Sequence, residues 1–359
     1  MEQQLVLVVY SLRGGGAERQ VAATANLLVR QGIRVSVLVM FRDEKEYPLD
    51  SSIAIYSIFK NREVYLKTGK IKKFFLMRKL VRSIKIKTLW SYDENISFFI
   101  KAFIKRRIKL VNFVLNARSF QTNRFRADYV IKHSFKNVLQ NEEQKKYYDQ
   151  NTLEKSVVIP NPMDFDSIVP KLEYREKITR IYMVGRMVPV KNYPLAIKAF
   201  KLVHDKYPEV RLDIYGTYFA SADNEAMMKF IQEAKLNDVV TFHGFSVQVR
   251  EEAKNYDLFL MTSITEGLPN ALIEAMATGV PAVVTNFETG SCDLLGNNNE
   301  RGIITLQTPE AVAEGIIKMI NDPTLATSYA MKAKTYVNTF LSEKVIIGKL
   351  LELARENNE

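Results

Sequence analysis

Glu266-Gly267-Leu268-Pro269-Asn270-Ala271-Leu272-Ile273-Glu274 is the stretch that decides the fold predicted from this sequence. The apolar run at residues 257–262 predicts a buried parallel strand, and residues 270–277 predict a helix with Pro269 at its first turn. A short loop therefore joins the C-terminal end of a strand to the N-terminus of a helix. Ligands bind at this edge of open parallel sheets, because unpaired backbone N–H groups and the helix dipole face outward there.

The two glutamates of this stretch predict what the ligand is. Glu266 lies on the loop, and Glu274 lies one helical turn inside the helix. Two carboxylates so placed can reach two hydroxyl-bearing groups of one ligand, while the N–H groups between them face an anion. A sugar nucleotide has this order of groups, because its diphosphate lies between the hydroxyls of the sugar and those of the ribose.

Length and composition predict two globular domains in a reducing compartment. A chain of 359 residues suits two domains of roughly 150 to 200 residues each. Cys292 is the single cysteine, which excludes an internal disulfide framework, and the three histidines lack the spacing of metal ligands. The N-terminus does not resemble a signal peptide, and the apolar run at residues 5–10 is too short to span a membrane. We expect a soluble or peripheral protein.

Positive charge is concentrated in one segment. The formal net charge is +11, and residues 60–110 alone contain 16 Lys or Arg against 3 Asp or Glu. This basic belt is typical of a surface for anionic lipid, lipid phosphates or nucleic acid. Residues 70–84 predict an amphipathic helix within it, whose basic face is either solvated or lies against lipid headgroups or a lipid-linked diphosphate. The two interpretations are compatible.

Strands and helices alternate along both halves of the chain. Residues 5–10 predict a buried strand, followed by a glycine-rich turn at residues 14–16, a helix to Arg30 and a second strand. The three consecutive glycines lack the spacing of the dinucleotide fingerprint, so they either allow close approach of a ligand or form a tight turn. Residues 127–131 predict a further short strand.

The two halves meet at a proline-containing linker near residues 157–177. We therefore expect domains at residues 1–168 and 169–340, with a C-terminal helix at about 341–359 packing back on the first. The second half begins with a strand that runs into Gly185-Arg186, with Lys191 five residues further on. The guanidinium of Arg186 can bind a phosphate through two hydrogen bonds, and the ammonium group of Lys191 provides a mobile positive charge. Both residues are expected on the same edge of the sheet as Glu266.

These motifs together resemble the retaining glycosyltransferases of glycosyltransferase family 4. The elements that carry the resemblance are Gly185-Arg186 with Lys191, the Glu-x7-Glu element and four further stretches. These stretches are Gly14-Gly15-Gly16-Ala17-Glu18-Arg19, Val158-Ile159-Pro160-Asn161-Pro162-Met163-Asp164, Phe242-His243-Gly244-Phe245 and Ala275-Met276-Ala277-Thr278-Gly279-Val280-Pro281-Ala282-Val283-Val284. The combination is specific although each piece alone is weak. The resemblance implies an α/β protein of the GT-B fold, with two Rossmann-like parallel-sheet domains facing across a cleft.

The resemblance also implies roles for the matching residues. Arg186 and Lys191 would hold the donor diphosphate and, with Glu266 beside the anomeric carbon, form the catalytic group. Glu274 would accept hydrogen bonds from the ribose hydroxyls. The remaining donor-binding positions would act mainly through their backbone, and they are Gly15, Gly16, Gly185, Phe245, Asn270 and Ala271.

The family works without a metal or another cofactor and retains anomeric configuration by front-face attack, so Glu266 is not expected to be a general base. Many members carry a His where Arg118 stands in this chain. Arg118 is therefore an acceptor-side candidate, together with Lys72, Lys73 and Arg78 of the basic belt. Relatives often carry a second glycine in the stretch that reads Gly216-Thr217-Tyr218 in this chain.

The leading hypothesis is transfer of a hexose or N-acetylhexosamine from a UDP-sugar to a lipid-diphosphate-linked glycan, with undecaprenyl diphosphate as the lipid carrier. The protein would then be cytoplasmic and peripheral on an anionic surface, the cytoplasmic face of the inner membrane. A GT-B-type sugar-nucleotide 2-epimerase is the alternative among enzymes. A nucleic-acid-binding protein is the alternative outside them, and the paired glutamates argue against it because nucleic acid does not require them.

Overall fold

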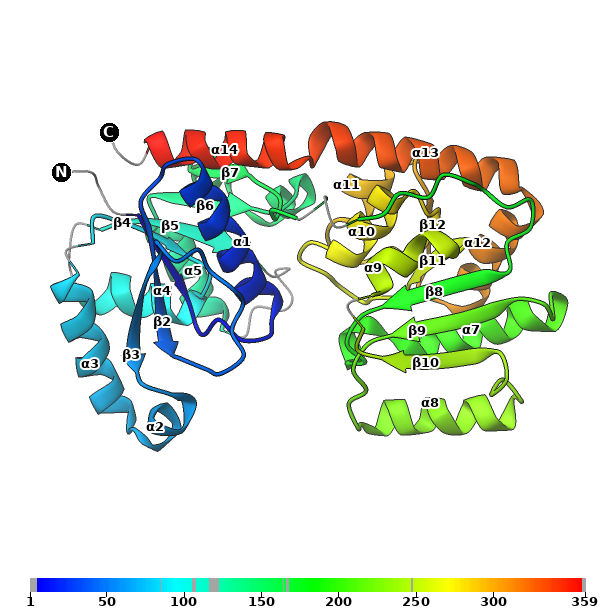
Figure 1. Cartoon of the computed structure of the whole chain (residues 1–359), viewed down its shortest axis with the longest axis horizontal. Helices are drawn as coiled ribbons and strands as arrows, with labels where there is room; N and C mark the ends of the chain where they lie inside the picture. The colour runs from blue at the N-terminus through cyan, green and yellow to red at the C-terminus, as the bar shows by residue number, and fades with distance from the viewer. Residues whose placement is uncertain are drawn as a thin grey trace. The chain divides into compact units, whose positions relative to one another are not determined.

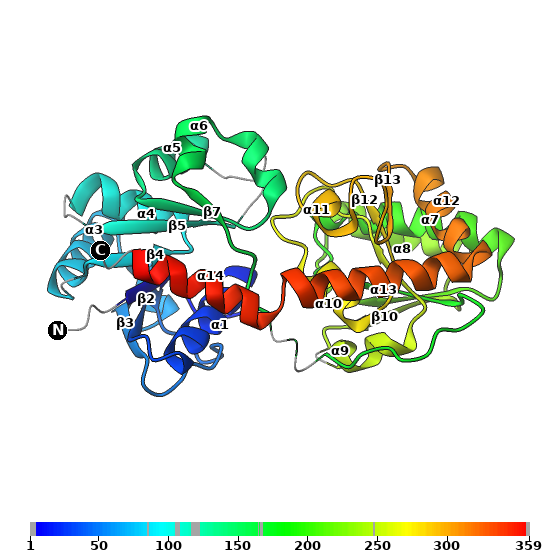
Figure 2. The same ribbon diagram turned by 90° about the horizontal axis from the view of Figure 1, so that it is seen from above.

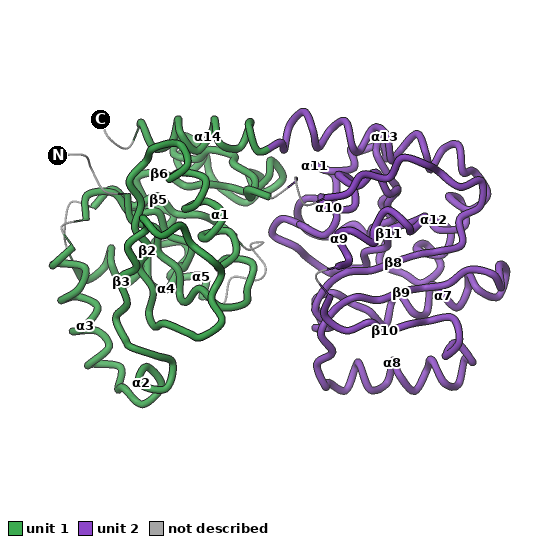
Figure 3. Tube along the Cα trace, viewed as in Figure 1, with its two compact units in different colours: residues 1–163, 343–359 green, residues 164–342 purple. Residues whose placement is uncertain are grey.

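The computed structural model describes residues 5–84, 86–104, 108–115, 123–163, 165, 168–246 and 248–356. Most of its helices and strands are labelled in Figure 1. The chain forms two compact units, coloured separately in Figure 3: unit 1 comprises residues 1–163 and 343–359, and unit 2 comprises residues 164–342. Over the described residues, no helix combines the length and the apolar character needed to cross a bilayer.

Unit 1 contains a parallel sheet of seven strands in the order β3-β2-β1-β4-β5-β6-β7. Its strands are β1 (Leu5–Val9), β2 (Val35–Phe41), β3 (Ala54–Phe59), β4 (Thr88–Ser91), β5 (Lys109–Val114), β6 (Lys136–Leu139) and β7 (Ser156–Val158). The apolar run that predicted β1 is buried along its whole length, as expected for a strand covered on both faces.

Alternate residues of β1 build two separate cores, because successive side chains of a strand point to opposite faces. Leu7 packs with residues of α1 and α14 on one face. Val8 packs with residues of α3, α4 and α5 on the other. The helices of this unit are α1 (Gly16–Arg30), α2 (Arg62–Lys67), α3 (Lys70–Ser83), α4 (Glu94–Phe99), α5 (Arg124–His133), α6 (Gln150–Glu154) and α14 (Glu343–Glu356).

Helix α14 comes from the far end of the sequence and lies beside α1 (Figures 1 and 2). Ile346, Leu350 and Leu353 are buried in the same core as β1 and α1. The last helix is therefore part of the hydrophobic core of unit 1.

Unit 2 contains a parallel sheet of six strands in the order β10-β9-β8-β11-β12-β13. The strands are β8 (Arg180–Val184), β9 (Arg211–Tyr215), β10 (Val240–Gly244), β11 (Leu258–Met261), β12 (Ala282–Thr285) and β13 (Ile303–Thr305). The helices are α7 (Tyr193–Lys206), α8 (Ala222–Glu233), α9 (Val249–Glu252), α10 (Asn270–Thr278), α11 (Ser291–Leu295), α12 (Pro309–Asn321) and α13 (Pro323–Phe340). Apolar residues of α7 and α12 form its main core with the sheet.

Each sheet has one point at which the strand order reverses. In unit 1 this switch point lies between β1 and β4, and in unit 2 between β8 and β11. Loops that leave the carboxyl ends of such strands diverge and expose backbone groups, so ligands of doubly wound sheets bind there. The glycine-rich turn follows β1, while Gly185 and Glu266 follow β8 and β11.

One predicted element is wrong. Residues 127–131 were expected to form a strand, but they lie inside helix α5. Asn123 caps this helix by accepting a hydrogen bond from the backbone N–H of Arg126, and Ala127, Val130 and Ile131 are buried at helical spacing. The neighbouring strand is β6, five residues further along the chain.

Candidate functional site

The loops that follow β8 and β11 are joined by hydrogen bonds. The Ile264 N–H donates to the Val190 carbonyl over 2.8 Å. The Thr262 hydroxyl donates to the carbonyls of Lys191 and Asn192, over 3.2 and 3.0 Å. Both loops therefore hold their shape through contacts with each other.

Lys191 and Glu266 meet where these loops touch. Lys191 Nζ lies 2.5 Å from Glu266 Oε1, and the Ser263 hydroxyl donates to the same oxygen over 2.6 Å. The Thr289 hydroxyl donates to the Glu266 backbone carbonyl over 2.6 Å. The carboxylate is thus paired with an ammonium group and fixed in direction, which suits an acceptor of hydrogen bonds from sugar hydroxyls.

Arg186 follows Gly185 at the end of β8 and is exposed. The Gly185 carbonyl accepts a hydrogen bond from the Tyr193 hydroxyl over 2.8 Å, which ties this turn to the start of α7. The structure thus places Arg186 and Lys191 on one loop, with Glu266 paired to Lys191.

Gly216 is required by the close approach of two loops. Its φ is +158°, and a Cβ built on it would lie 1.7 Å from the Gly185 carbonyl oxygen, which belongs to the backbone and cannot move aside cheaply. The Gly216 N–H donates to the Gly244 carbonyl over 2.7 Å. A glycine is therefore needed for the ends of β8, β9 and β10 to lie this close together.

Glu274 lies on α10 and forms the second ion pair of the unit. Arg250 of α9 places its Nη2 atom 2.6 Å from Glu274 Oε1. Both residues line a narrow pocket whose other walls are Ile168, Tyr182, Val184, Val249, Ala253, Ala271 and Thr278. Burial among these groups raises the pKa of Glu274, and the adjacent Arg250 guanidinium opposes that effect.

The N-terminus of α10 has a more complex geometry than the sequence suggested. Pro269 precedes the first residue of the helix, and its carbonyl accepts from the N–H groups of Leu272 and Ile273. The Asn270 N–H donates to the Leu268 carbonyl over 2.9 Å, so a ligand on this group would have to replace that bond. Ala271 lines the Glu274 pocket.

Phe245 follows β10 and is 78% exposed. Gly244 before it has a φ of +70°, and His243 places Nε2 2.5 Å from Asp213 Oδ1. These contacts fix the strand end from which the Phe245 backbone emerges, at the edge strand of the sheet.

The glycine-rich turn of unit 1 lies at the start of α1. Gly15 is the N-cap residue, and a Cβ built on it would lie 2.1 Å from Oε2 of Glu18, the end of a flexible side chain. A Cβ built on Gly16 would meet nothing within 4 Å. Arg13 donates to both carboxylate oxygens of Asp43, over 3.0 and 3.2 Å, and so anchors the turn to the loop after β2.

The acceptor-side candidates have different surroundings. Lys72 is exposed on α3, whereas Lys73 and Arg78 are half-buried. Lys73 Nζ lies 3.6 Å from the centroid of the Tyr65 ring. Arg118 lies outside the described residues.

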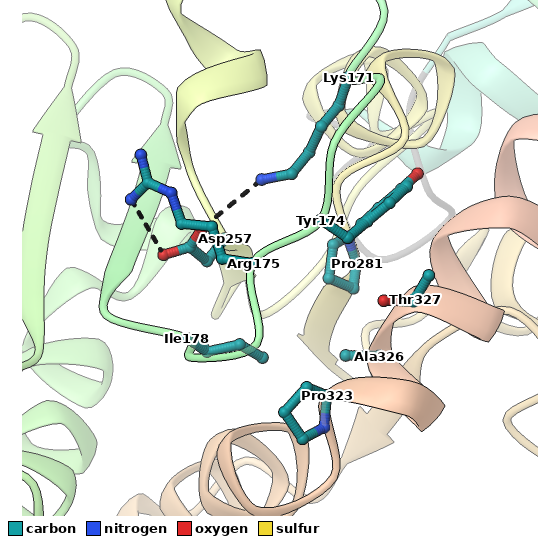
Figure 4. A pocket seen from close by; sticks show the side chains of 9 residues that line it. All are labelled: Lys171, Tyr174, Arg175, Ile178, Asp257, Pro281, Pro323, Ala326 and Thr327. Atoms are coloured by element: carbon teal, nitrogen blue, oxygen red, sulfur yellow. Dashed lines mark ion pairs between the residues drawn. The ribbon is translucent and has the colours of Figure 1, made fainter.

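A second pocket in unit 2 lies away from these loops (Figure 4). It surrounds Asp257, which immediately precedes β11 and therefore stands at the opposite end of the strand from Glu266. Lys171 and Arg175 lie 3.5 and 3.8 Å from its carboxylate, and its Oδ2 accepts from the N–H groups of Thr179 and Arg180. These bonds anchor the segment that leads into β8.

The sequence reading missed Arg250, Ser263 and Thr289. Arg250 stands beside Glu251 and Glu252 in a short helix, a composition typical of solvated surface. Its role is visible only once α9 and α10 are placed together. Among the residues that the structure describes, no three His, Cys, Asp or Glu side chains are arranged to hold a metal ion.

Comparison with known proteins identifies this half of the chain. The family described as Glycosyl transferases group 1 matches residues 164–336. Residues 164–336, just under half of the chain, are therefore similar to a glycosyl transferases group 1 domain. The glycosyltransferase class predicted from the sequence is supported at this level, while the assignment to family 4 stays a prediction.

Relatives of the group 1 domain cover nearly the whole chain. An uncharacterized glycosyltransferase of Haemophilus influenzae is 27% identical over 345 residues, 92% of this chain and 94% of the relative. The N-acetylgalactosamine-N,N'-diacetylbacillosaminyl-diphospho-undecaprenol 4-alpha-N-acetylgalactosaminyltransferase of Campylobacter jejuni is 24% identical, over 96% of this chain and 97% of its own. The structure of HepE from Anabaena with UDP and glucose superposes with a TM-score of 0.79 at 16% identity, over 99% of this chain and 100% of the other. The fold predicted from the sequence, GT-B with two parallel-sheet α/β domains, is confirmed.

Proposed function

We propose that this protein is a retaining glycosyltransferase that moves a hexose or N-acetylhexosamine from a UDP-sugar to an undecaprenyl-diphosphate-linked glycan. The observation that carries the proposal is the pairing of Lys191 with Glu266 at the switch point of a group 1 domain, with Glu274 in a pocket of the same unit. The Campylobacter relative is named for transfer to such a lipid-linked glycan, and HepE was solved with UDP and glucose.

The charges of these loops match the parts of a UDP-sugar. Arg186 and Lys191 would bind the diphosphate, and Lys191 has donors beyond the one it gives to Glu266. Glu266 would accept from hydroxyls of the donor sugar and Glu274 from those of the ribose. Gly185, Phe245, Asn270 and Ala271 would complete this donor site through their backbone, while the donor-binding role of Gly15 and Gly16 stays a prediction from the family.

Transfer breaks the bond between the anomeric carbon and the diphosphate oxygen, and the acceptor hydroxyl oxygen forms a bond to that carbon on the same face. The acceptor proton passes to the departing phosphate. Negative charge grows on the diphosphate during this step, so Lys191 and Arg186 stabilise the transition state more than the bound donor. Glu266 needs no proton transfer in this scheme, which agrees with its engagement by Lys191 and Ser263.

A donor screen tests the proposal. UDP release is measured for a panel of UDP-sugars with a lipid-diphosphate disaccharide, and the product is analysed by NMR for the configuration of the new linkage. We expect acceptor-dependent release with one donor, a retained linkage and a rate unchanged by EDTA. Sugar-nucleotide conversion without acceptor would indicate an epimerase, and an inverted linkage or loss of rate in EDTA would contradict the mechanism.

The surface of α3 supports attachment to an anionic membrane. Ile71 and Phe75 are 76% and 60% exposed and lie one turn apart on the same face of this helix. Lys72 is exposed on the same helix, and its first turn contains no acidic residue. Apolar side chains between basic ones are typical of helices that lie in a lipid interface, and a position on the cytoplasmic face of the inner membrane would give access to a lipid-linked acceptor.

Vesicle flotation tests this part separately. The wild-type protein should bind vesicles containing phosphatidylglycerol and not neutral phosphatidylcholine vesicles, and Ile71→Ser with Phe75→Ser should weaken that binding about tenfold or more. Leu202→Ser, at an exposed leucine on α7, is the matched control. Equal binding to both vesicle types would contradict the proposal, and a gel shift with single-stranded RNA would reveal nucleic acid as the partner instead.

A further inference from the structure

The ion pair between Arg250 and Glu274 lies in the part of the donor site assigned to the ribose. The two side chains are 23% and 18% exposed, and Arg250 Nη2 is 2.6 Å from Glu274 Oε1. Most of the other walls of the pocket are apolar. A carboxylate in such surroundings loses hydration, which favours its neutral form.

Arg250 is presented by a helix that is itself fixed. Glu252 on the same short helix α9 accepts a hydrogen bond from the Tyr215 hydroxyl over 2.8 Å. The Tyr215 hydroxyl also lies 2.8 Å from that of Tyr256. The backbone of α9 is thereby tied to β9 and to the segment before β11, so the direction of Arg250 does not depend on Glu274 alone.

The charge of Glu274 matters for the proposed ligand. Two neighbouring ribose hydroxyls can both donate to an ionised carboxylate, which has acceptor sites on both oxygens. A protonated carboxyl group places a donor against them and loses one of these bonds. Hydrogen bonds to a charged group are also about twice as strong as bonds to a neutral one.

We propose that Arg250 is a positioning residue for nucleotide binding, whose guanidinium keeps Glu274 charged and directed at the ribose. The inference rests on the proposed function and deepens it, because it assigns a role to a residue that does not itself have to touch the nucleotide. Arg250 acts through Glu274.

Few other groups can change the charge of the pocket. Of the residues that line it, Arg250 from α9, Tyr182 from β8 and Glu274 itself ionise. Burial raises the pKa of the Tyr182 hydroxyl, so this group stays neutral across the range of the experiment. A pH-dependent change in nucleotide binding between pH 6 and 8.5 that appears on loss of Arg250 therefore reports on Glu274.

The test is UDP binding by isothermal titration calorimetry from pH 6 to 8.5, for the wild type and Arg250→Met. Removal of the guanidinium leaves burial unopposed, so the pKa of Glu274 rises and the carboxylate is lost as the pH falls. The terminal phosphate of UDP titrates near the low end of this range in both proteins, so the quantity compared is the ratio of wild-type to variant affinity at each pH. Relative to the wild type, the variant should bind about threefold to tenfold more weakly at pH 8.5, and this ratio should grow as the pH falls toward 6.

Three variants separate this role from a purely structural one. Arg250→Lys keeps the charge and should restore the pH profile of the wild type. Glu252→Gln changes the same helix at a residue that does not contact Glu274. The pH dependence of its UDP affinity should therefore be the same as that of the wild type. Arg250→Met combined with Glu274→Gln removes the titrating group, so the added pH dependence should disappear.

The possible outcomes test the role of Arg250 separately from the proposed glycosyltransferase function. Uniformly weaker binding of Arg250→Met at every pH, or a profile equal to the wild type, would overturn the inference alone. A wild-type protein that binds no UDP at any pH would overturn the proposed function as well. Arg250→Gln replaces Arg250→Met if thermal melting shows that the methionine variant is unfolded.

Discussion

The two switch points of the molecule differ in how tightly the chain fills them. In unit 2 the Gly185 carbonyl occupies the place where a Gly216 side chain would stand, and loops from three strands bond to one another. In unit 1 a side chain on Gly16 would meet no atom within 4 Å. Contacts within the protein require a glycine at position 216. They do not require one at position 16, so Gly16 serves either the approach of a ligand or the turn alone. Substitutions in the two regions should therefore have different effects.

The largest effect is expected for Lys191→Ala. Loss of the ammonium group removes charge stabilisation from the departing diphosphate, and kcat should fall by about 10² to 10³. Glu266 also loses its partner, so the nucleotide affinity should be compared with the wild type by calorimetry. Lys201→Ala removes a lysine from a surface ion pair with Asp205 and is the control. An unchanged kcat would remove Lys191 from the catalytic group.

Glu274→Ala should act mainly on binding. Loss of hydrogen bonds between a carboxylate and the ribose should weaken UDP affinity about 10- to 100-fold, with a smaller effect on kcat at saturating donor. The comparison is made by calorimetry and by initial rates. Glu233→Ala, from a surface pair on α8, should leave both quantities unchanged. A loss confined to kcat would place Glu274 at the reacting end of the donor instead.

Gly216→Ala should lower stability, because the new Cβ meets a backbone oxygen at 1.7 Å and one of the two loops must move. We expect a loss of roughly 2 kcal/mol in the free energy of unfolding, measured in urea. A stability equal to the wild type would show that the loops of unit 2 are less constrained than their contacts indicate.

The smallest effect on stability is expected for Gly16→Ala. The free energy of unfolding should stay within about 0.5 kcal/mol of the wild type, since the site is open and lies at the start of α1. If a ligand approaches the backbone here, kcat/KM for the donor should still fall by about tenfold. Unchanged kcat/KM would favour the alternative that the glycines serve only the turn.

Most of the fold could be predicted because buried parallel strands leave a strong pattern. Leu5–Val9 and Leu258–Met261 are continuous apolar runs that end at turn residues, and both form central strands. The α5 error arose because residues 129–131 are also an apolar run, and a run of three does not distinguish a strand from a buried helical face. The short strands β6 and β7 were missed since they carry polar residues such as Asn137 and Ser156.

The candidate site also contains residues that could be predicted from the sequence and residues that could not. Gly185, Lys191 and Glu266 could be placed because each follows a recognisable strand, and the carboxyl ends of parallel strands meet at one edge. The Arg250–Glu274 pair could not, since the two residues are 24 positions apart and on different helices. Only the packing of α9 against the end of the sheet brings them together.

The position of α14 has a consequence for synthesis of the protein. Four of its apolar residues, Ile346, Leu350, Leu353 and Ala354, complete a core whose other buried members come from the first 163 residues. The first unit thus cannot reach its final state as it leaves the ribosome, and it must wait until the whole of the second has been made. During that interval the apolar residues that α14 later covers are exposed on the nascent first unit and can bind chaperones. A fragment ending at Met163 should bind chaperones for the same reason.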